Sequence, residues 1–196
     1  VNGEYYWYQK TNVWEKKRLL NFTPRPVIDS RARHRTMIPD EEYENGHILT
    51  AKSCKKLQDA GVKINLGSHG QIQGIGAHWE TWMFVQGGMT PMQALQASTI
   101  NGAVHLGMDK EIGSIKSGKL ADLVILDKNP LTNIQHTEAI RSVMLNGRLY
   151  DAETLNEIGN YDSKRSKFYF EMEGSANTWP AMGESFGHQP TCLCGK

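Results

Sequence analysis

The sequence predicts an α/β fold that ends in a small antiparallel β-unit. Between residues 50 and 66, a helical pattern passes through Gly61 into the alternating run VKINL, as at the helix–strand joint of an α/β fold. Between residues 112 and 151, short extended runs follow one another without long helices, as in an antiparallel sheet. The predicted regions are 1–110, 111–151 and an extended tail, 152–196.

Composition and charge weigh against several classes of partner. The 196 residues are 39% hydrophobic and 22% charged, as in a globular protein that buries a core. The formal net charge of +1 gives no reason to expect nucleic acid or a membrane. The basic run RARHR is followed at once by the acidic DEEYE, which cancels its field. No apolar run approaches the ~20 residues of a spanning helix, and no signal segment opens the chain.

The first residue is Val1, not Met, so we expect either a processed protein or a piece of a longer one. The compartment stays open for the same reason. Three cysteines are too few for a disulfide scaffold. Cys54 falls in a helical pattern, and we expect it to act as a small buried apolar residue.

The elements follow in order. Prolines, mixed charges and an aromatic cluster predict loops and short helices over residues 1–49. Thr50 is a plausible N-cap for a helix that Gly61 ends. A second helix begins at Ala77, with Trp79 and Trp82 expected in the core, and closes at two glycines.

The most clearly specified helix starts at Thr90-Pro91-Met92-Gln93 and is predicted to run to Gly107. Its start combines an N-cap, a proline at the first helical position and a glutamine three residues after the cap. IGSIKSGKLADLVILD predicts two short extended runs around a Ser-Gly turn. SVMLNGRLYD predicts a hairpin that turns at Asn146-Gly147.

These segments resemble a known family. The series GGMTPMQALQASTINGAVHLGMDKEIGSIKSGKLADLVILDKNPL, followed by VMLNGRLYD, resembles the C-terminal end of the metal-dependent amidohydrolases. The resemblance is to the imidazolonepropionase-like branch and to the large members with an upstream β-propeller.

The resemblance implies a fold and a cofactor. It implies an α/β fold with the C-terminal portion of a TIM-type (β/α)8 barrel and a share of a small antiparallel β-sandwich. VKINL would be the last barrel strand. One or two divalent metal ions, most naturally zinc, would sit at the strand ends in the full enzyme, although this chain alone need not bind one.

Two departures from the family pattern concern the metal ligands. The chain contains no His-x-His pair, which in the family ends the first barrel strand. The last strand usually ends in Gly-Thr-Asp, whose carboxylate binds metal and accepts a proton, but here the segment reads Gly67-Ser68-His69. We expect the remaining ligands upstream of this chain.

His69 is the predicted catalytic and metal-binding residue. A histidine can ligate a metal through one nitrogen or act as a base, and barrel chemistry lies at the C-terminal ends of strands. Gln71, Gln73 and His78 are the predicted substrate-binding residues. The competing interpretations are that His69 only caps the strand end and that His78 only packs or caps a helix.

A second metal site is conceivable at the C-terminus. His188, Cys192 and Cys194 in HQPTCLCG could hold a soft ion such as zinc, but three ligands match no standard structural site. The alternative is a tail with incidental thiols.

Two functional hypotheses follow. In the first, the chain is the C-terminal part of a hydrolase that uses metal-activated water on a C–N bond of a small-molecule amide or cyclic amide, and it is inactive alone. In the second, it is a non-catalytic module derived from an amidohydrolase that associates with itself. The expected partner is therefore a second copy or the upstream portion of the barrel, because unpaired strand edges promote association.

Overall fold

The structure is a computed structural model that describes residues 2–31, 38–41, 45–68 and 72–172. Its helices and strands, in chain order, are α1 (Asn2–Lys10), η1 (Val13–Glu15), α2 (Lys17–Phe22), α3 (Arg25–Arg31), α4 (Gly46–Asp59), α5 (Ile75–Gln86), α6 (Pro91–Ala97), α7 (Ile100–His105), β1 (Leu123–Leu126), η3 (Ile134–Glu138), β2 (Ile140–Leu145), β3 (Arg148–Asp151), β4 (Glu157–Ile158) and η4 (Tyr169–Glu171).

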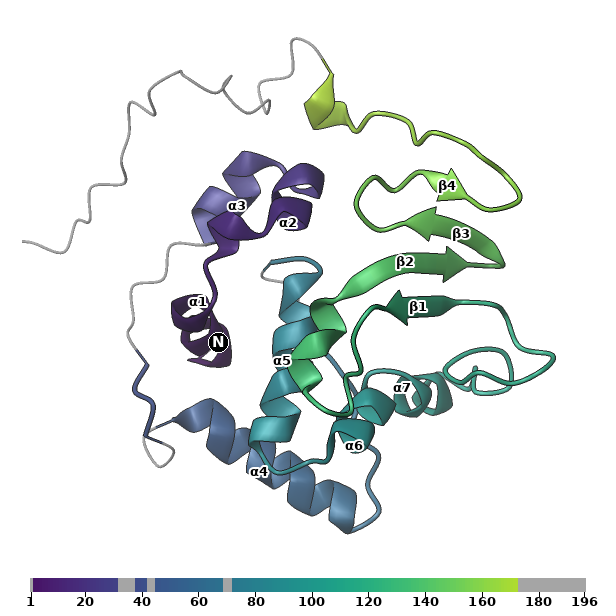
Figure 1. Cartoon of the computed structure of the whole chain (residues 1–196). Helices are drawn as coiled ribbons and strands as arrows, with labels where there is room; N and C mark the ends of the chain where they lie inside the picture. Colours follow the sequence, from purple (N-terminus) through teal and green to yellow (C-terminus); the bar gives the residue numbers. More distant parts are fainter. Residues whose placement is uncertain (1, 32–37, 42–44, 69–71, 173–196) are drawn as a thin grey trace, which may run out of the picture.

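Helix α5 occupies the centre of the molecule. It packs against α1, α4, α6 and η3, and Figure 1 shows it between the N-terminal helices and the β-sheet. Its Trp79 and Trp82 are 0% and 4% exposed, so the prediction of two core tryptophans is confirmed. Trp7 and Tyr8 of α1 meet them edge to face, each with ring centroids 4.9 Å apart, a favourable aromatic geometry.

Helix α4 begins five residues earlier than predicted. Thr50 lies inside the helix and its hydroxyl donates to the Gly46 carbonyl at 2.8 Å, so it is not the N-cap. That position belongs to the buried Asn45. The predicted end is confirmed, because the helix closes before Gly61, which has a φ of +91°.

The predicted helix from Thr90 to Gly107 is two helices. Its start is as expected, since Thr90 Oγ1 accepts from Gln93 N and Gln93 Oε1 accepts from Thr90 N, with Pro91 in the first turn. The break falls at Ser98 and Thr99, and Thr99 adopts a non-helical conformation. Both hydroxyls hydrogen-bond carbonyls four residues back, a bond that competes with regular helix.

The four described strands form one antiparallel sheet in the order β1-β2-β3-β4. The predicted hairpin is confirmed: Asn146 and Gly147 both have positive φ, as a two-residue turn of this hand requires. Of the two extended runs predicted around the Ser-Gly turn, only the second forms a strand, β1. The segment before it consists of turns, bends and irregular backbone.

Residues 62–66, the predicted barrel strand VKINL, form no strand among the described residues. Leu66 N donates to the Ala97 carbonyl, and Asn101 Nδ2 donates to the Ile64 carbonyl. The end of α6 and a side chain of α7 thus satisfy backbone groups that a neighbouring strand would satisfy in a ladder. Ile64 and Leu66 still pack against the core.

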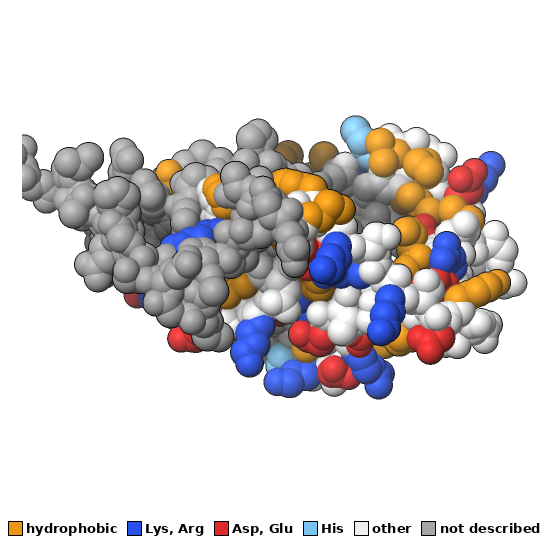
Figure 2. Space-filling view, turned by 90° about the horizontal axis from the view of Figure 1, so that it is seen from above, with side chains coloured by type: hydrophobic (Ala, Val, Ile, Leu, Met, Phe, Trp, Pro, Cys, Tyr) orange, Lys and Arg blue, Asp and Glu red, His pale blue; other side chains and the backbone are white. Residues whose placement is uncertain are grey.

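The surface carries charges of both signs. Figure 2 shows Lys and Arg side chains intermixed with Asp and Glu side chains on the face seen there. None of the helices that the structure describes combines the length and the apolar composition that crossing a bilayer requires.

Candidate functional site

A cavity of about 640 Å3 lies between α2, the start of α5 and the η3–β2 connection. We call it the α2–β2 cavity. Gly74, with a φ of +81°, turns the chain into α5 in a conformation that glycine tolerates. This turn brings Gln73 and His78 to the same cavity wall. Small-molecule sites typically have volumes of ~300–1,000 Å3, so the cavity has the size of a binding site.

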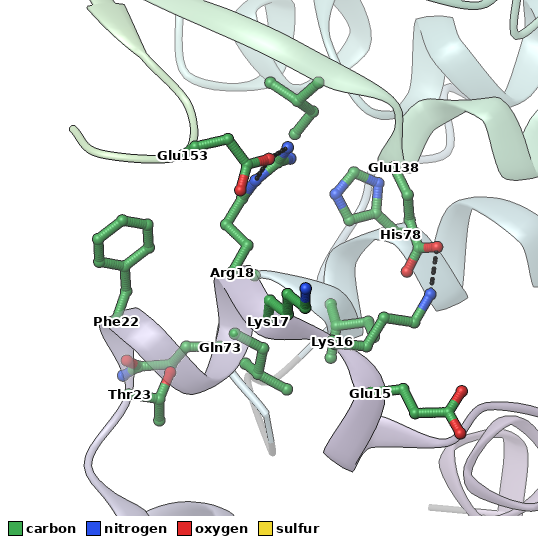
Figure 3. A pocket seen from close by; sticks show the side chains of 14 residues that line it. Glu15, Lys16, Lys17, Arg18, Phe22, Thr23, Gln73, His78, Glu138 and Glu153 are labelled. Carbon is green, nitrogen blue, oxygen red and sulfur yellow. Dashed lines mark hydrogen bonds and ion pairs between the residues drawn. The ribbon is translucent and has the colours of Figure 1, made fainter. Parts of the chain in front are cut away.

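Two ion pairs join the helical side of the cavity to the sheet side. Lys16 Nζ lies 2.7 Å from Glu138 Oε2, and Arg18 pairs with Glu153. Figure 3 shows both pairs at the cavity wall. In each pair the two charges neutralise each other, so the wall is polar but neither positive nor negative charge dominates.

Apolar side chains complete the wall. Leu19 and Phe22 come from α2, Ile75 from α5 and Ile140 from β2. A second cavity of about 400 Å3 adjoins the first and shares Lys16 and Glu138 with it. The Lys16–Glu138 pair therefore lies where the two cavities meet.

Thr137 holds the imidazole of His78 on the side away from the cavity. The imidazole Nδ1 lies 3.0 Å from Thr137 Oγ1, which also accepts a hydrogen bond from Trp82 Nε1 at 2.9 Å. Burial lowers the pKa of His78; the charge of Glu138 opposes this shift, and the charges of Lys16 and Arg18 add to it. A histidine with a lowered pKa is uncharged at neutral pH.

Glu80 anchors the segment that leads to the predicted catalytic residue. Both of its carboxylate oxygens accept from Gly67 N, at 3.1 and 3.2 Å. Burial raises the pKa of Glu80, although the bond from Gly67 acts in the opposite direction. Cys54 of α4 lies near this carboxylate, whose charge adds to burial in raising the pKa of the thiol. Cys54 is partly buried against the core.

The structure brings together two of the four residues predicted at the active site. Gln73 and His78 line the α2–β2 cavity. His69 and Gln71 lie outside the described residues. The second predicted metal site, formed by His188, Cys192 and Cys194, lies outside them as well.

The described residues do not fit a metal centre by themselves. Within them, no group of three or more His, Cys, Asp or Glu side chains is placed to hold an ion. Catalytic metal sites generally use three protein ligands.

The sequence alone did not identify the opposite wall of the cavity. Lys16 and Glu138 are 122 positions apart, and Arg18 and Glu153 are 135 apart. No local pattern links residues at such separations, and Thr137 shows no sequence signal for its contact with His78. The charged run EKKR at residues 15–18 was the one available clue, and alone it indicates only a solvated face.

Comparison with known proteins agrees with the resemblance to the amidohydrolases seen in the sequence. A model of the amidohydrolase family matches residues 30–150, more than half of the 196 residues. The chain belongs to the amidohydrolase family. The matched segment includes Gln73, His78 and Thr137 but not Lys16 or Arg18. The cavity wall with Gln73 and His78 thus lies within the segment that matches the family, and most of the opposite wall lies outside it.

The similarity to individual proteins is partial. Ochratoxinase from Aspergillus niger is 30% identical over 163 residues, which cover 78% of this chain and 34% of that protein. Imidazolonepropionase from Shouchella clausii is 37% identical over 94 residues, 46% of this chain and 21% of that protein. The chain thus matches about a third or less of the length of these relatives. A Xaa-Pro dipeptidase crystallised with methionine in its active site gives a TM-score of 0.47 at 35% identity, covering 52% of this chain and 25% of that one.

Proposed function

We propose that this chain is the C-terminal part of an amidohydrolase-type hydrolase that acts on a C–N bond of an amide or cyclic amide. In this proposal the α2–β2 cavity holds part of the small-molecule substrate. Family membership supports the reaction class. The observation that carries the assignment of the cavity is that Gln73 and His78, which the sequence nominates for substrate binding, line one space of suitable size.

The roles of the wall residues follow from their chemistry. Gln73 offers an amide that both donates and accepts, and neutral His78 offers one donor or one acceptor. Leu19, Phe22 and Ile75 accommodate an apolar group.

We propose His69, two residues after Gly67, as the catalytic group. The metal that the family resemblance implies would need ligands beyond the described residues, so we assign it no step here. VKINL would become the last barrel strand once neighbouring strands are supplied. This proposal accounts for the alternating sequence of 62–66, which pairs with no strand among the described residues.

A titration of the 196-residue chain tests the proposal. Uncharged N-acyl amides should bind saturably, and Gln73→Ala should weaken binding several-fold because a hydrogen-bonding group is lost. Gln96→Ala is the matched control, since Gln96 is exposed on α6. Equal affinity of both variants and the unmodified chain would argue against a site at Gln73.

An assay of amine release, with and without added zinc, tests whether the chain is only part of a site. We expect no turnover from the chain alone, because the sequence contains no His-x-His pair, the motif that ends the first barrel strand in the family. Turnover that disappears in His69→Ala would contradict the partial-site proposal and place a complete site within this chain.

The alternative is a non-catalytic module that associates with itself. It is favoured by the edge of the sheet, because among the described strands β1 pairs only with β2. Val124 of this edge strand is 58% exposed. An apolar edge strand is a template for pairing with another chain.

Sedimentation velocity over a range of concentrations tests this alternative. Association through β1 predicts that Val124→Lys shifts the chain to monomer, since a charge on an edge strand blocks pairing. Ile115→Lys, at a residue that is 88% exposed but outside the sheet, should leave association unchanged. A monomer at every concentration would exclude the module.

A further inference from the structure

A chain of hydrogen bonds connects α5 to η3 behind the α2–β2 cavity. Trp82 Nε1 donates to Thr137 Oγ1, and His78 Nδ1 lies at hydrogen-bond distance from the same oxygen. His78 and Trp82 stand four residues apart on α5, so they share one face of the helix. Thr137 is 8% exposed, and a buried hydroxyl needs partners within the protein.

The chemistry of the three groups limits where the protons can lie. An indole nitrogen only donates, whereas a threonine hydroxyl accepts through its lone pairs and donates a single hydrogen. Trp82 therefore uses a lone pair of Thr137 Oγ1. Among the described residues, His78 Nδ1 is the one acceptor for the hydroxyl hydrogen. An O–H···Nδ1 bond leaves the proton of the neutral imidazole on Nε2.

The Nε2 atom is open to the cavity. It has no hydrogen-bond partner within the described part of the chain, and it is not one of the polar atoms sealed in the interior. His78 lines the cavity, and in Figure 3 its ring lies beside Glu138 on the side that faces Arg18. A proton on Nε2 would therefore give the wall an N–H donor whose direction is held by Thr137.

The charges around this donor favour an uncharged ligand. Lys16 and Arg18 are each paired with a carboxylate. Counting Lys17 and Glu15 as well, the lining holds three cationic and three anionic side chains. A balanced wall with a neutral histidine gives an anionic ligand no net attraction.

We infer that Thr137 fixes His78 as the Nε2–H tautomer and that this N–H binds the carbonyl oxygen of an uncharged amide. The apolar group of that amide packs against Leu19, Phe22 and Ile75, which line the same cavity. His78 is then a substrate-binding residue, and Thr137 is a positioning residue that acts through it. The inference rests on the proposed function, because it requires the cavity to bind a small molecule.

The tautomer can be measured without any turnover. The imidazole 15N chemical shifts of the full chain, labelled at histidine, distinguish protonated from unprotonated ring nitrogens, and His78→Phe assigns the signals. We expect the proton on Nε2 in the unmodified chain and in Thr137→Ser, which keeps the hydroxyl. In Thr137→Val the two tautomers should mix. Thr137→Ser thus separates loss of the hydroxyl from a change in packing.

The ligand is tested by titration with N-acetylphenylalaninamide, which is uncharged, and with N-acetylphenylalanine, which carries a carboxylate. The amide should shift the His78 Nε2 signal and bind more tightly than the carboxylate. His78→Phe keeps an aromatic ring but loses the donor, so its affinity for the amide should fall about tenfold.

The outcomes separate this inference from the proposed function. A proton on Nδ1 in the unmodified chain overturns the inference and leaves the cavity as a binding site. The same holds if the amide shifts signals of other cavity residues but not His78 Nε2, or if the carboxylate binds more tightly. If neither compound shifts the signal of any cavity residue, the cavity assignment within the proposed function fails, and the inference fails with it.

Discussion

At the scale of single residues, Glu80 is a carboxylate whose charged form is destabilised by burial. Burial disfavours its charge while two hydrogen bonds from Gly67 N favour it, and the net effect raises the pKa of Glu80 above its ordinary value of 4.5. The folded protein therefore binds this proton more tightly than the unfolded chain. As pH rises from 4.5 through the raised folded value, Glu80 ionises and the free energy of unfolding falls.

We therefore expect Glu80→Gln to be at least as stable as the unmodified chain at pH 7, because glutamine still accepts from Gly67 N without carrying a charge. Near pH 4 the difference should disappear. Urea unfolding at both pH values measures this. The control is Glu111→Gln at an exposed carboxylate, which removes the same formal charge. A Glu80→Gln chain that is clearly less stable at pH 7 would mean that the hydrogen bonds require the carboxylate.

Also at the scale of single residues, the sequence does not show which distant partner orients a functional side chain. His78 could be nominated from its place after a glycine-rich segment, but its tautomer depends on Thr137, which is 59 positions away. The sequence predicts which side chains carry chemistry. It does not specify the partner that orients them, because that contact depends on how η3 packs against α5.

At the scale of elements, the start of α6 rests on its capping box. Thr90 Oγ1 and Gln93 Oε1 each accept from the backbone N–H of the other residue. Thr90→Ala should lower the free energy of unfolding by about 1 kcal/mol, since a backbone donor loses its partner. Thr50 lies on the exposed face of α4. Thr50→Ala should be neutral or slightly stabilising because alanine favours helix. Thermal unfolding of both variants compares them.

The contact between α4 and α5 depends on a missing side chain. A Cβ atom at Gly87 would lie 2.3 Å from the backbone carbon of Ala51, far inside van der Waals contact. Gly87→Ala should therefore destabilise the fold by about 1–3 kcal/mol through overpacking.

Gly102→Ala is the matched control for this prediction. Gly102 lies in α7 with open space around it, so alanine should add about 0.5–1 kcal/mol of stability by favouring helix. Chemical denaturation gives both values. If the two substitutions have the same effect, helix propensity rather than close packing governs Gly87.

Elements with strong local signals were predictable, and those that depend on neighbours were not. The Thr90 cap, the glycine ends of α4 and α5 and the Asn146-Gly147 turn are specified within a few residues. VKINL has the alternation of a strand, but a strand also needs a neighbour to pair with. The break between α6 and α7 was missed because Ser98 and Thr99 read as ordinary helical positions until their hydroxyls bond back to the helix.

At the scale of the whole molecule, long-range ion pairs hold α2 against the sheet side of the cavity. Lys16 pairs with Glu138 beside the start of β2, and Arg18 pairs with Glu153 beyond β3. The Lys16 and Glu138 side chains are 36% and 26% exposed. A partly solvated pair of this kind contributes about 0.2–1 kcal/mol and weakens as salt is added. Its position matters more than its strength, because it lies between the two cavities.

Opening of this pair should therefore appear as local loosening rather than global unfolding. Glu138→Gln should speed amide hydrogen exchange in α2 and η3, and added salt should do the same in the unmodified chain, while α4 exchanges as before. Lys55→Ala breaks an ion pair within α4 itself and should leave α2 unchanged. If Glu138→Gln alters exchange in every element equally, the pair stabilises the fold as a whole. If it alters α2 and η3 alone, the pair acts locally, at the place where the two cavities meet.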